Sequence, residues 1–288
     1  MQPISFYKYM TIQTAIKVLS NRKLRWSAYH RLNDAHDLRV TFRLDGNFQD
    51  AKTLSIEKLW EDYSAGNNSV KNISGAFIQY IRSLNPDIPK ATFAAILEEA
   101  FLTPQEINKS IENFNSELLA NCADCKILCL TDSPENRLMW AHYAEEHAGL
   151  VMKFENVPTL DSPYKMAKPV QYVSDYPTLF DIESLSDLLS GRISLHNRDT
   201  IKKIMDQFAF TKNKCWAYER EWRIALWGGK QPLGEYEDSL FHKEELKSII
   251  FGVRTSEKSI KEISEIVHSS YPSVQLTKSS PLPFNHPL

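Results

Sequence analysis

The sequence has little glycine, little net charge and no long apolar run, and each shortage excludes a class of protein. Only nine of its 288 residues are glycine, and it has no Gly-rich phosphate loop, no Gly-x-Ser-x-Gly turn and no kinase signature. Phosphate-binding loops of the Walker and Rossmann types are therefore excluded. Lys and Arg number 34 against 36 Asp and Glu, a net charge of −2. The overall basic field that would indicate nucleic acid as the main partner is missing, although a local basic cleft remains possible.

No stretch approaches the roughly 18 apolar residues that a membrane-spanning helix needs. The first ten residues, MQPISFYKYM, also lack a basic segment followed by an apolar run, which is the pattern of a secretion signal. We therefore expect a cytoplasmic protein with no membrane partner.

Cysteine is scarce too, with four residues, Cys122, Cys125, Cys129 and Cys215. Cys122 and Cys125 have the spacing of zinc and redox sites, but a structural zinc site usually needs a second such pair. Cys129 lies in an apolar run, where a small buried thiol is common. The pattern favours ordinary reduced cysteines, and we expect no metal.

Hydrophobic periodicity predicts a single α+β domain over residues 1–288 with a mixed β-sheet core. Strands are expected at 6–9, 24–27, 126–131, 150–154, 169–173, 216–226, 248–251 and 274–277. Thr11 suits the cap of a first helix, and Ser133 with Pro134 suits the start of another that Gly149 would end. Further helices are expected at 182–189, 199–210 and 257–268, and helical patterns between about 52 and 121 predict a helical insertion.

The run WAYEREWR at Trp216–Arg223 is the sharpest chemical feature. Alternate residues of a strand share a face, so one face of this strand would be aromatic. The other would carry Glu219, Glu221 and Arg223 between small residues. Such a set can stabilise a developing cation, accept a proton and anchor an anion. The alternative is a solvated strand face with weak ion pairs.

Two other segments could contribute to a site. The helix around Leu138–Ala144 carries Trp140, His142 and Tyr143, which favour a packed core over a stacking platform at this spacing. His142 and His147 are poorly spaced to share a metal. Near the N-terminus, adjacent strands would place Lys8, Arg25 and Ser27 around a phosphate. Their neighbours there are Tyr7, Tyr9, Asn33 and Asp34, and the alternative is surface charge with an Asn-Asp turn.

Together these segments resemble a bacterial and phage family known as domain of unknown function 2971. The resemblance rests on motifs in a fixed order, namely Tyr7-Lys-Tyr9, Leu24–Ser27, Leu32–Asp34, Leu138–Ala144, Lys214–Arg223 and Leu246–Gly252. It covers nearly the whole chain apart from residues 50–120.

More weakly, the order of the parts resembles ADP-ribosyltransferases, whose late strand carries a Glu-x-Glu motif. That resemblance implies an ADP-ribosyltransferase-like fold, NAD as co-substrate, and Glu221 as the carboxylate that stabilises an oxocarbenium-like transition state. It further implies that Glu219 orients the acceptor, that Lys8 or Arg25 holds the pyrophosphate, and that Tyr143 or Trp140 stacks on nicotinamide.

The function expected from this resemblance is that of an NAD-dependent transferase, acting as a toxin or phage-defence effector on a protein or nucleic-acid acceptor. Two alternatives remain open. One is a nucleic-acid-binding or nuclease-like accessory protein, with basic residues along a groove and tryptophans stacked on bases. The other is a non-catalytic interaction module with an aromatic pocket for a peptide. The transferase hypothesis requires the side chains of Glu219 and Glu221 to line one cleft together with Lys8, Arg25 and Tyr143.

Overall fold

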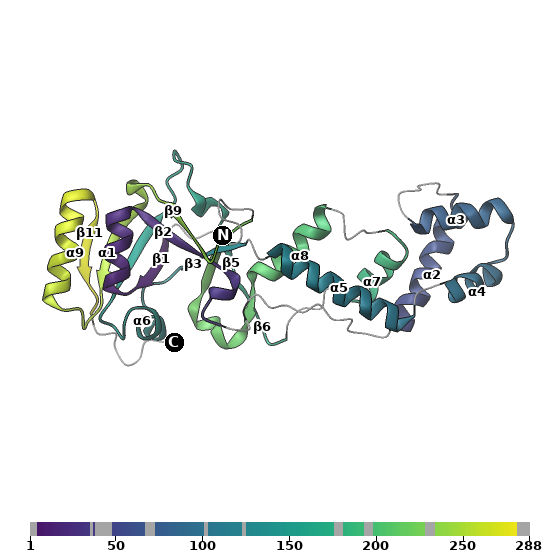
Figure 1. The fold of residues 1–288 in the computed structure, drawn as a ribbon, viewed down its shortest axis with the longest axis horizontal. Coiled ribbons are helices and arrows are strands. Elements are labelled where there is room, and N and C mark those ends of the chain that lie inside the picture. Colours follow the sequence, from purple (N-terminus) through teal and green to yellow (C-terminus); the bar gives the residue numbers. More distant parts are fainter. Residues whose placement is uncertain are drawn as a thin grey trace. The chain divides into compact units, whose positions relative to one another are not determined.

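The computed structural model describes residues 5–34, 37, 48–66, 73–100, 103–122, 125–175, 181–192, 198–227 and 234–280. The chain divides into two compact units. The first, here called the sheet unit, comprises residues 1–39, 121–175 and 209–288. The second, the helical unit, comprises residues 40–120 and 176–208. In Figure 1 the labelled strands lie in the sheet unit together with α1, α6 and α9, and α2, α3, α4 and α7 lie in the helical unit.

The sheet unit is built on one mixed sheet, whose strands run in the order β11-β10-β4-β1-β3-β2-β9. Along another edge, β8 pairs with β3 and β5 pairs with β8. Only β10 and β11 are parallel among these described pairs. The strands are β1 (Ser5–Met10), β2 (Lys23–Ala28), β3 (Lys126–Thr131), β4 (Leu150–Glu155), β5 (Lys168–Pro169), β8 (Glu221–Leu226), β9 (Tyr236–Leu240), β10 (Leu246–Phe251) and β11 (Gln275–Lys278).

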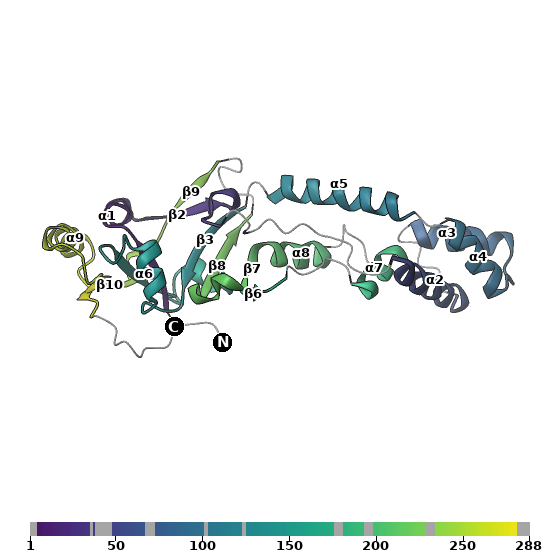
Figure 2. The ribbon, with the colours of Figure 1, turned by 90° about the horizontal axis from the view of Figure 1, so that it is seen from below.

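Among its described residues, this unit also has three α-helices that lie wholly within it, short 3₁₀ helices and a small second sheet. The helices are α1 (Ile12–Asn21), α6 (Arg137–Tyr143) and α9 (Glu257–Ser270), and β6 (Gln171–Val173) pairs in parallel with β7 (Thr211–Asn213). Side chains of α1 and α9 share a buried cluster with Phe6 and Met10 of β1. On β1, Tyr9 belongs instead to a cluster with Trp140 of α6. Figure 2 shows these helices around the sheet.

The predicted α+β class with a mixed sheet is confirmed. The positions of β1, β3 and β4 were predicted correctly from their apolar residues, because each strand buries side chains in the core. Thr11 caps α1 as predicted, its hydroxyl accepting a hydrogen bond from the Thr14 backbone N–H at 3.2 Å. Strand β9 was not predicted.

The expected limits of α6 are wrong at both ends. The cap is Asn136, whose side chain accepts hydrogen bonds from the backbone N–H groups of Leu138 and Met139, rather than Ser133. The helix ends at Tyr143, well before Gly149, because Glu145, Glu146 and His147 all have positive φ. Left-handed backbone cannot continue an α-helix, so the chain turns there before entering β4.

The helical unit has a core of its own. Its helices are α2 (Phe48–Ser64), α3 (Ile73–Leu84), α4 (Lys90–Ala100), α5 (Pro104–Cys122), α7 (Ile182–Leu189) and α8 (Arg198–Phe210), the last residues of α5 and α8 being counted with the sheet unit. Buried side chains of α2, α3 and α4 form one cluster. Lys58 of α2 donates to Asp187 of α7 at 2.6 Å. The unit contains most of the predicted insertion and, in addition, residues 176–208. Within the described residues, no helix is long and apolar enough to cross a bilayer.

Candidate functional site

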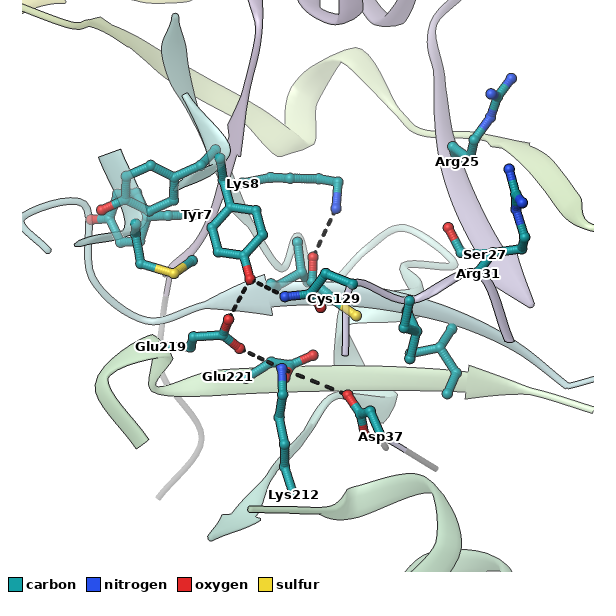
Figure 3. A pocket seen from close by; sticks show the side chains of 17 residues that line it. Tyr7, Lys8, Arg25, Ser27, Arg31, Asp37, Cys129, Lys212, Glu219 and Glu221 are labelled. Carbon is teal, nitrogen blue, oxygen red and sulfur yellow. Dashed lines mark hydrogen bonds and ion pairs between the residues drawn. The ribbon is translucent and has the colours of Figure 1, made fainter. Parts of the chain in front are cut away.

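The site begins at a break in the pairing along one edge of β3. At one end of this edge, β2 pairs with β3 through Ser27–Ile127 and Ala28–Lys126. At the other end, β1 pairs with it through Tyr7–Thr131. Between these ends, the Lys8 amine donates to the Cys129 carbonyl oxygen at 2.9 Å. A side chain therefore fills a position that a strand neighbour would occupy in a continuous ladder, and the two strands diverge around it (Figure 3).

A cavity of about 210 Å³ lies at this divergence. Strands β1, β2, β3 and β8 supply most of its walls, helix α6 supplies Tyr143, and β7 supplies Lys212. The lining residues are Tyr7, Lys8, Tyr9, Arg25, Ser27, Arg31, Leu32, Asn33, Asp37, Ile127, Cys129, Leu130, Met139, Tyr143, Lys212, Glu219 and Glu221. All of them belong to the sheet unit.

Most of the residues selected from the sequence line this one cavity. They include both glutamates, and they come from segments far apart in the chain, namely Tyr7, Lys8, Tyr9, Arg25, Ser27, Asn33, Tyr143, Glu219 and Glu221. Four other candidates, Asp34, Trp140, His142 and Arg223, do not line it. Strands β1 and β2 are not paired with each other as expected, because each pairs with a different end of the same edge of β3. Their side chains still line one cavity.

The expected strand over Trp216–Leu226 is only half correct. Residues Lys214–Glu219 form a 3₁₀ helix, which Asn213 caps by accepting a hydrogen bond from the Cys215 N–H. Arg220 then adopts left-handed backbone at φ 46°, and the strand begins at Glu221. Strict alternation holds only from Glu221 onward. Glu219 reaches the cavity from the end of the 3₁₀ helix, so the two glutamates do not share a strand face.

Arg223 is wholly buried and is held on two sides by carboxylates. Its guanidinium donates to Glu221 at 2.8 and 3.0 Å and to Asp37 at 2.5 and 3.0 Å. It also donates to the Ala209 carbonyl oxygen at 3.0 Å. Because these hydrogen bonds occupy its guanidinium, Arg223 orients Glu221. It does not anchor an anion in the cavity, which is the role that the strand pattern had suggested.

Lys212 links the carboxylates from the other side. Its amine lies 2.6 Å from Glu219, 3.1 Å from Glu221 and 3.6 Å from Asp37, and Figure 3 shows this arrangement beneath the cavity. Burial alone would lower the pKa of Lys212, but the attraction of these carboxylates outweighs it and raises that pKa. Lys212 is therefore a permanent cation within the cluster.

The carboxyl groups of this cluster differ in acidity. Burial raises the pKa of Glu219 and that of Asp37, although the nearby cations oppose the shift. Burial acts on Glu221 in the same direction, but Arg223 and Lys212 outweigh it and lower its pKa to about 2. At neutral pH Glu221 is a fixed anion, whereas Glu219 is the carboxyl better suited to exchange a proton.

Tyr143 connects helix α6 to this cluster. Its hydroxyl donates to Glu219 at 2.5 Å and accepts a hydrogen bond from the Asn33 side chain. Burial, followed by the hydrogen bond to Glu219, raises the pKa of Tyr143, so it remains a neutral donor. Trp140 on the same helix is a core residue, 3% exposed, and donates to the Pro134 carbonyl oxygen.

The remaining candidates lie at the surface or in the core. Arg25 lines the cavity but also forms an exposed ion pair with Asp238 at 2.9 Å. His142 is exposed and touches the Tyr218 ring. Among the residues whose placement is described, no three His, Cys, Asp or Glu side chains gather as metal ligands. The side chain of Cys122 lies outside them.

Three residues that line the cavity, Lys212, Asp37 and Cys129, were not predicted from the sequence as site residues. Lys212 and Asp37 carry no motif, and each joins the cluster through contacts with residues distant in the chain. Cys129 was placed correctly in a strand, but its side chain faces the cavity instead of packing only into the core. Burial and the charge of Glu221 raise its thiol pKa, so Cys129 is a poor nucleophile.

Acidification is expected to remove the contribution of ionised Glu221 to the free energy of unfolding. Because its folded-state pKa of about 2 lies below the ordinary value of 4.5, this contribution is complete above pH 4.5 and is lost as the pH falls toward 2. Carbon NMR titration of the carboxyl groups is the direct measurement. The Glu221 signal should move only near pH 2, and the Glu219 signal should move above the ordinary glutamate value of 4.5. Coincident titration of the two would contradict the assignment.

The sheet unit therefore belongs to the class of α+β proteins with a mixed sheet, and it encloses a cavity lined by buried charge. The model of one family, described as protein of unknown function (DUF2971), matches residues 139–224. The resemblance stated from the motifs is confirmed over this stretch. The matched stretch contains Tyr143, Lys212, Glu219, Glu221 and Arg223. Comparisons with curated proteins and with solved structures gave no match.

Proposed function

We propose that the protein is an NAD-dependent enzyme of the ADP-ribosyltransferase type, with an ADP-ribosyltransferase-like fold in its sheet unit. The observation that carries the proposal is the convergence of Glu219 and Glu221 with Lys8, Arg25 and Tyr143 on one cavity. The alternative of an outer strand face with solvated ion pairs required these glutamates to be exposed, and they are 4% and 5% exposed.

Glu221 is the residue to which the proposal assigns stabilisation of the sugar cation. The reaction breaks the bond between nicotinamide and ribose, and positive charge develops on the sugar as nicotinamide leaves. A carboxylate that is already ionised and fixed by Arg223 and Lys212 does not have to reorganise when that charge appears, which is the condition for electrostatic stabilisation. Its low pKa keeps it ionised throughout the physiological range.

Glu219 and Tyr143 are assigned to the acceptor. Burial raises the pKa of Glu219, and its hydrogen bond from Tyr143 fixes the orientation of both groups. In this proposal Glu219 accepts the proton that the acceptor loses when it attacks the sugar carbon. The cavity, at about 210 Å³, is smaller than a typical site for a drug-sized ligand. We therefore assign the nicotinamide ribose to it and the phosphates to its rim beside Arg25 and Arg31.

The nucleic-acid alternative receives less support from the geometry. It called for a continuous basic groove without carboxylates at its floor, yet Glu219 and Glu221 line the cavity. Arg223 is wholly buried, so it cannot contribute a basic side chain to the surface of such a groove. A role as a toxin or phage-defence effector is part of the transferase proposal, and loss of viability on expression in a bacterial host would support it.

The proposal is tested with labelled NAD and a cell lysate. We expect the wild-type protein to release nicotinamide and to transfer label, and Glu221→Gln to do so at least about tenfold more slowly, because one preorganised electrostatic group is lost. Thermal unfolding must show that the variant is folded under the assay conditions. Glu257→Gln, an exposed change in the first turn of α9, is the matched control and should retain full activity. Folded wild-type protein that releases no nicotinamide would exclude the proposal.

A further inference from the structure

The two lysines of the cavity have opposite surroundings. Lys212 is surrounded by three carboxylates, the nearest at 2.6 Å. The Lys8 amine instead donates to a neutral backbone oxygen, that of Cys129, at 2.9 Å. Among the described residues, no carboxylate is in ion-pair contact with Lys8. The same cavity therefore contains one lysine that is stabilised as a cation and one that is not.

This difference determines which amine can react. Burial lowers the pKa of Lys8, and the opposing attractions of Cys129 and Glu221 do not restore it. An amine that has lost its proton has a free electron pair and is a nucleophile, as in enzymes that use a desolvated lysine to attack carbonyl groups. Lys212, whose pKa is raised, has no such electron pair.

The geometry gives the Lys8 amine both a fixed position and access to a ligand. Figure 3 shows its side chain reaching from β1 into the space between β1 and β2, with Arg25 and Ser27 on the far side. The hydrogen bond to Cys129 uses one N–H and holds the amine at the cavity wall. A cavity of about 210 Å³ admits a small molecule beside it.

We propose that Lys8 binds a small aldehyde or ketone covalently, as an imine. The inference does not rest on the transferase activity proposed above. The electron pair of Nζ attacks the carbonyl carbon, a carbon–nitrogen bond forms as the C=O π bond breaks, and one proton passes from nitrogen to oxygen to give a carbinolamine. The C–O bond then breaks as the hydroxyl takes up a further proton and leaves as water, and the nitrogen loses its second proton as the C=N bond forms. Nothing is oxidised or reduced. Glu219, on the same cavity, is the carboxyl we assign to the proton transfers.

Reductive trapping with propanal tests the proposal on the full-length wild-type chain. The folded protein is incubated at pH 7 with propanal and sodium cyanoborohydride, which delivers hydride to the imine carbon and makes the bond permanent. Peptide mass spectrometry then measures propylation at every lysine. We expect Lys8 to be labelled several-fold faster than exposed Lys17 of α1, because burial lowers the pKa of Lys8 and leaves more of its amine neutral. Lys212 should be labelled more slowly than Lys17.

Two controls separate reactivity due to the fold from reactivity due to sequence. In urea, where burial is lost, the advantage of Lys8 over Lys17 should disappear. A Lys8→Arg variant keeps a long side chain with N–H donors at the position but lacks the reactive amine, so its intact mass should lack the fastest addition. Folded wild-type protein in which Lys8 reacts no faster than Lys17 would overturn the proposal, and that comparison does not depend on whether the variant folds.

Discussion

Replacing Arg223 with methionine is expected to reduce the free energy of unfolding of the sheet unit by about 3–5 kcal/mol, the cost of removing one partner from a buried ion pair. The guanidinium donates to Glu221, to Asp37 and to the Ala209 carbonyl oxygen, and its side chain is wholly buried. Methionine fills much of the volume but supplies no hydrogen-bond donor. Three carboxylates would then share the single cation Lys212. Urea-induced unfolding followed by tryptophan fluorescence measures the loss.

Arg25→Met is the matched control for this prediction. Arg25 also pairs with a carboxylate, that of Asp238, but its side chain is 58% exposed. Water already screens the pair, and the change should cost about 0–1 kcal/mol. Equal losses in the two variants would show that the buried cluster stabilises the fold no more than a surface pair does.

Gly252→Ala is the second substitution expected to have a large effect. A β-carbon at this position would lie 2.0 Å from the His147 carbonyl oxygen. That oxygen accepts a hydrogen bond from the Arg254 N–H at 3.0 Å, and the Gly252 N–H donates to the Gly149 carbonyl oxygen at 3.0 Å. The backbone around His147 and Gly149 therefore cannot move away from the backbone around Gly252 and Arg254 without breaking these hydrogen bonds. We expect a loss at or above the upper end of the roughly 1–3 kcal/mol typical of overpacking.

Thermal unfolding of Gly252→Ala and of Val253→Ala provides the comparison. Val253 is the next residue and is 36% exposed, so shortening its side chain should change stability by only about 0.5 kcal/mol. If Gly252→Ala unfolds at the wild-type temperature, the close approach of the two backbone segments does not limit the fold.

Local patterns accounted for much of the sheet unit. Strand β3 has the predicted bounds, and β1, β4 and α9 lie within a few residues of theirs, because their buried faces repeat with the period of the element. The errors occurred where tertiary contacts set the ends. Asn136, not Ser133, caps α6 because its side chain also donates to the Tyr218 carbonyl oxygen. The 3₁₀ helix before Glu221 interrupts a run whose composition is that of a strand.

In the candidate site, too, the sequence predicted some features and tertiary contacts determined the others. The Glu-x-Glu spacing and the aromatic composition of WAYEREWR drew attention to the correct segment, and most selected residues line one cavity. The pattern did not distinguish the two glutamates. One became a fixed anion and the other a carboxyl of raised pKa through Arg223 and Lys212. Lys212 and Asp37 were not selected, because their contacts join segments that no local pattern relates.

The sequence by itself determined the α+β class, the family resemblance over residues 139–224, most of the strands and the residue types available for chemistry, since periodicity and short motifs are local properties. Only the tertiary structure decided what WAYEREWR does in the molecule. It placed Glu219 on a 3₁₀ helix, buried Arg223 between Glu221 and Asp37, and left Lys8 in a break between strands without a carboxylate partner among the described residues. The physical reason is that charge states and cavities depend on burial and on neighbours brought together by folding, and neither is encoded in local spacing.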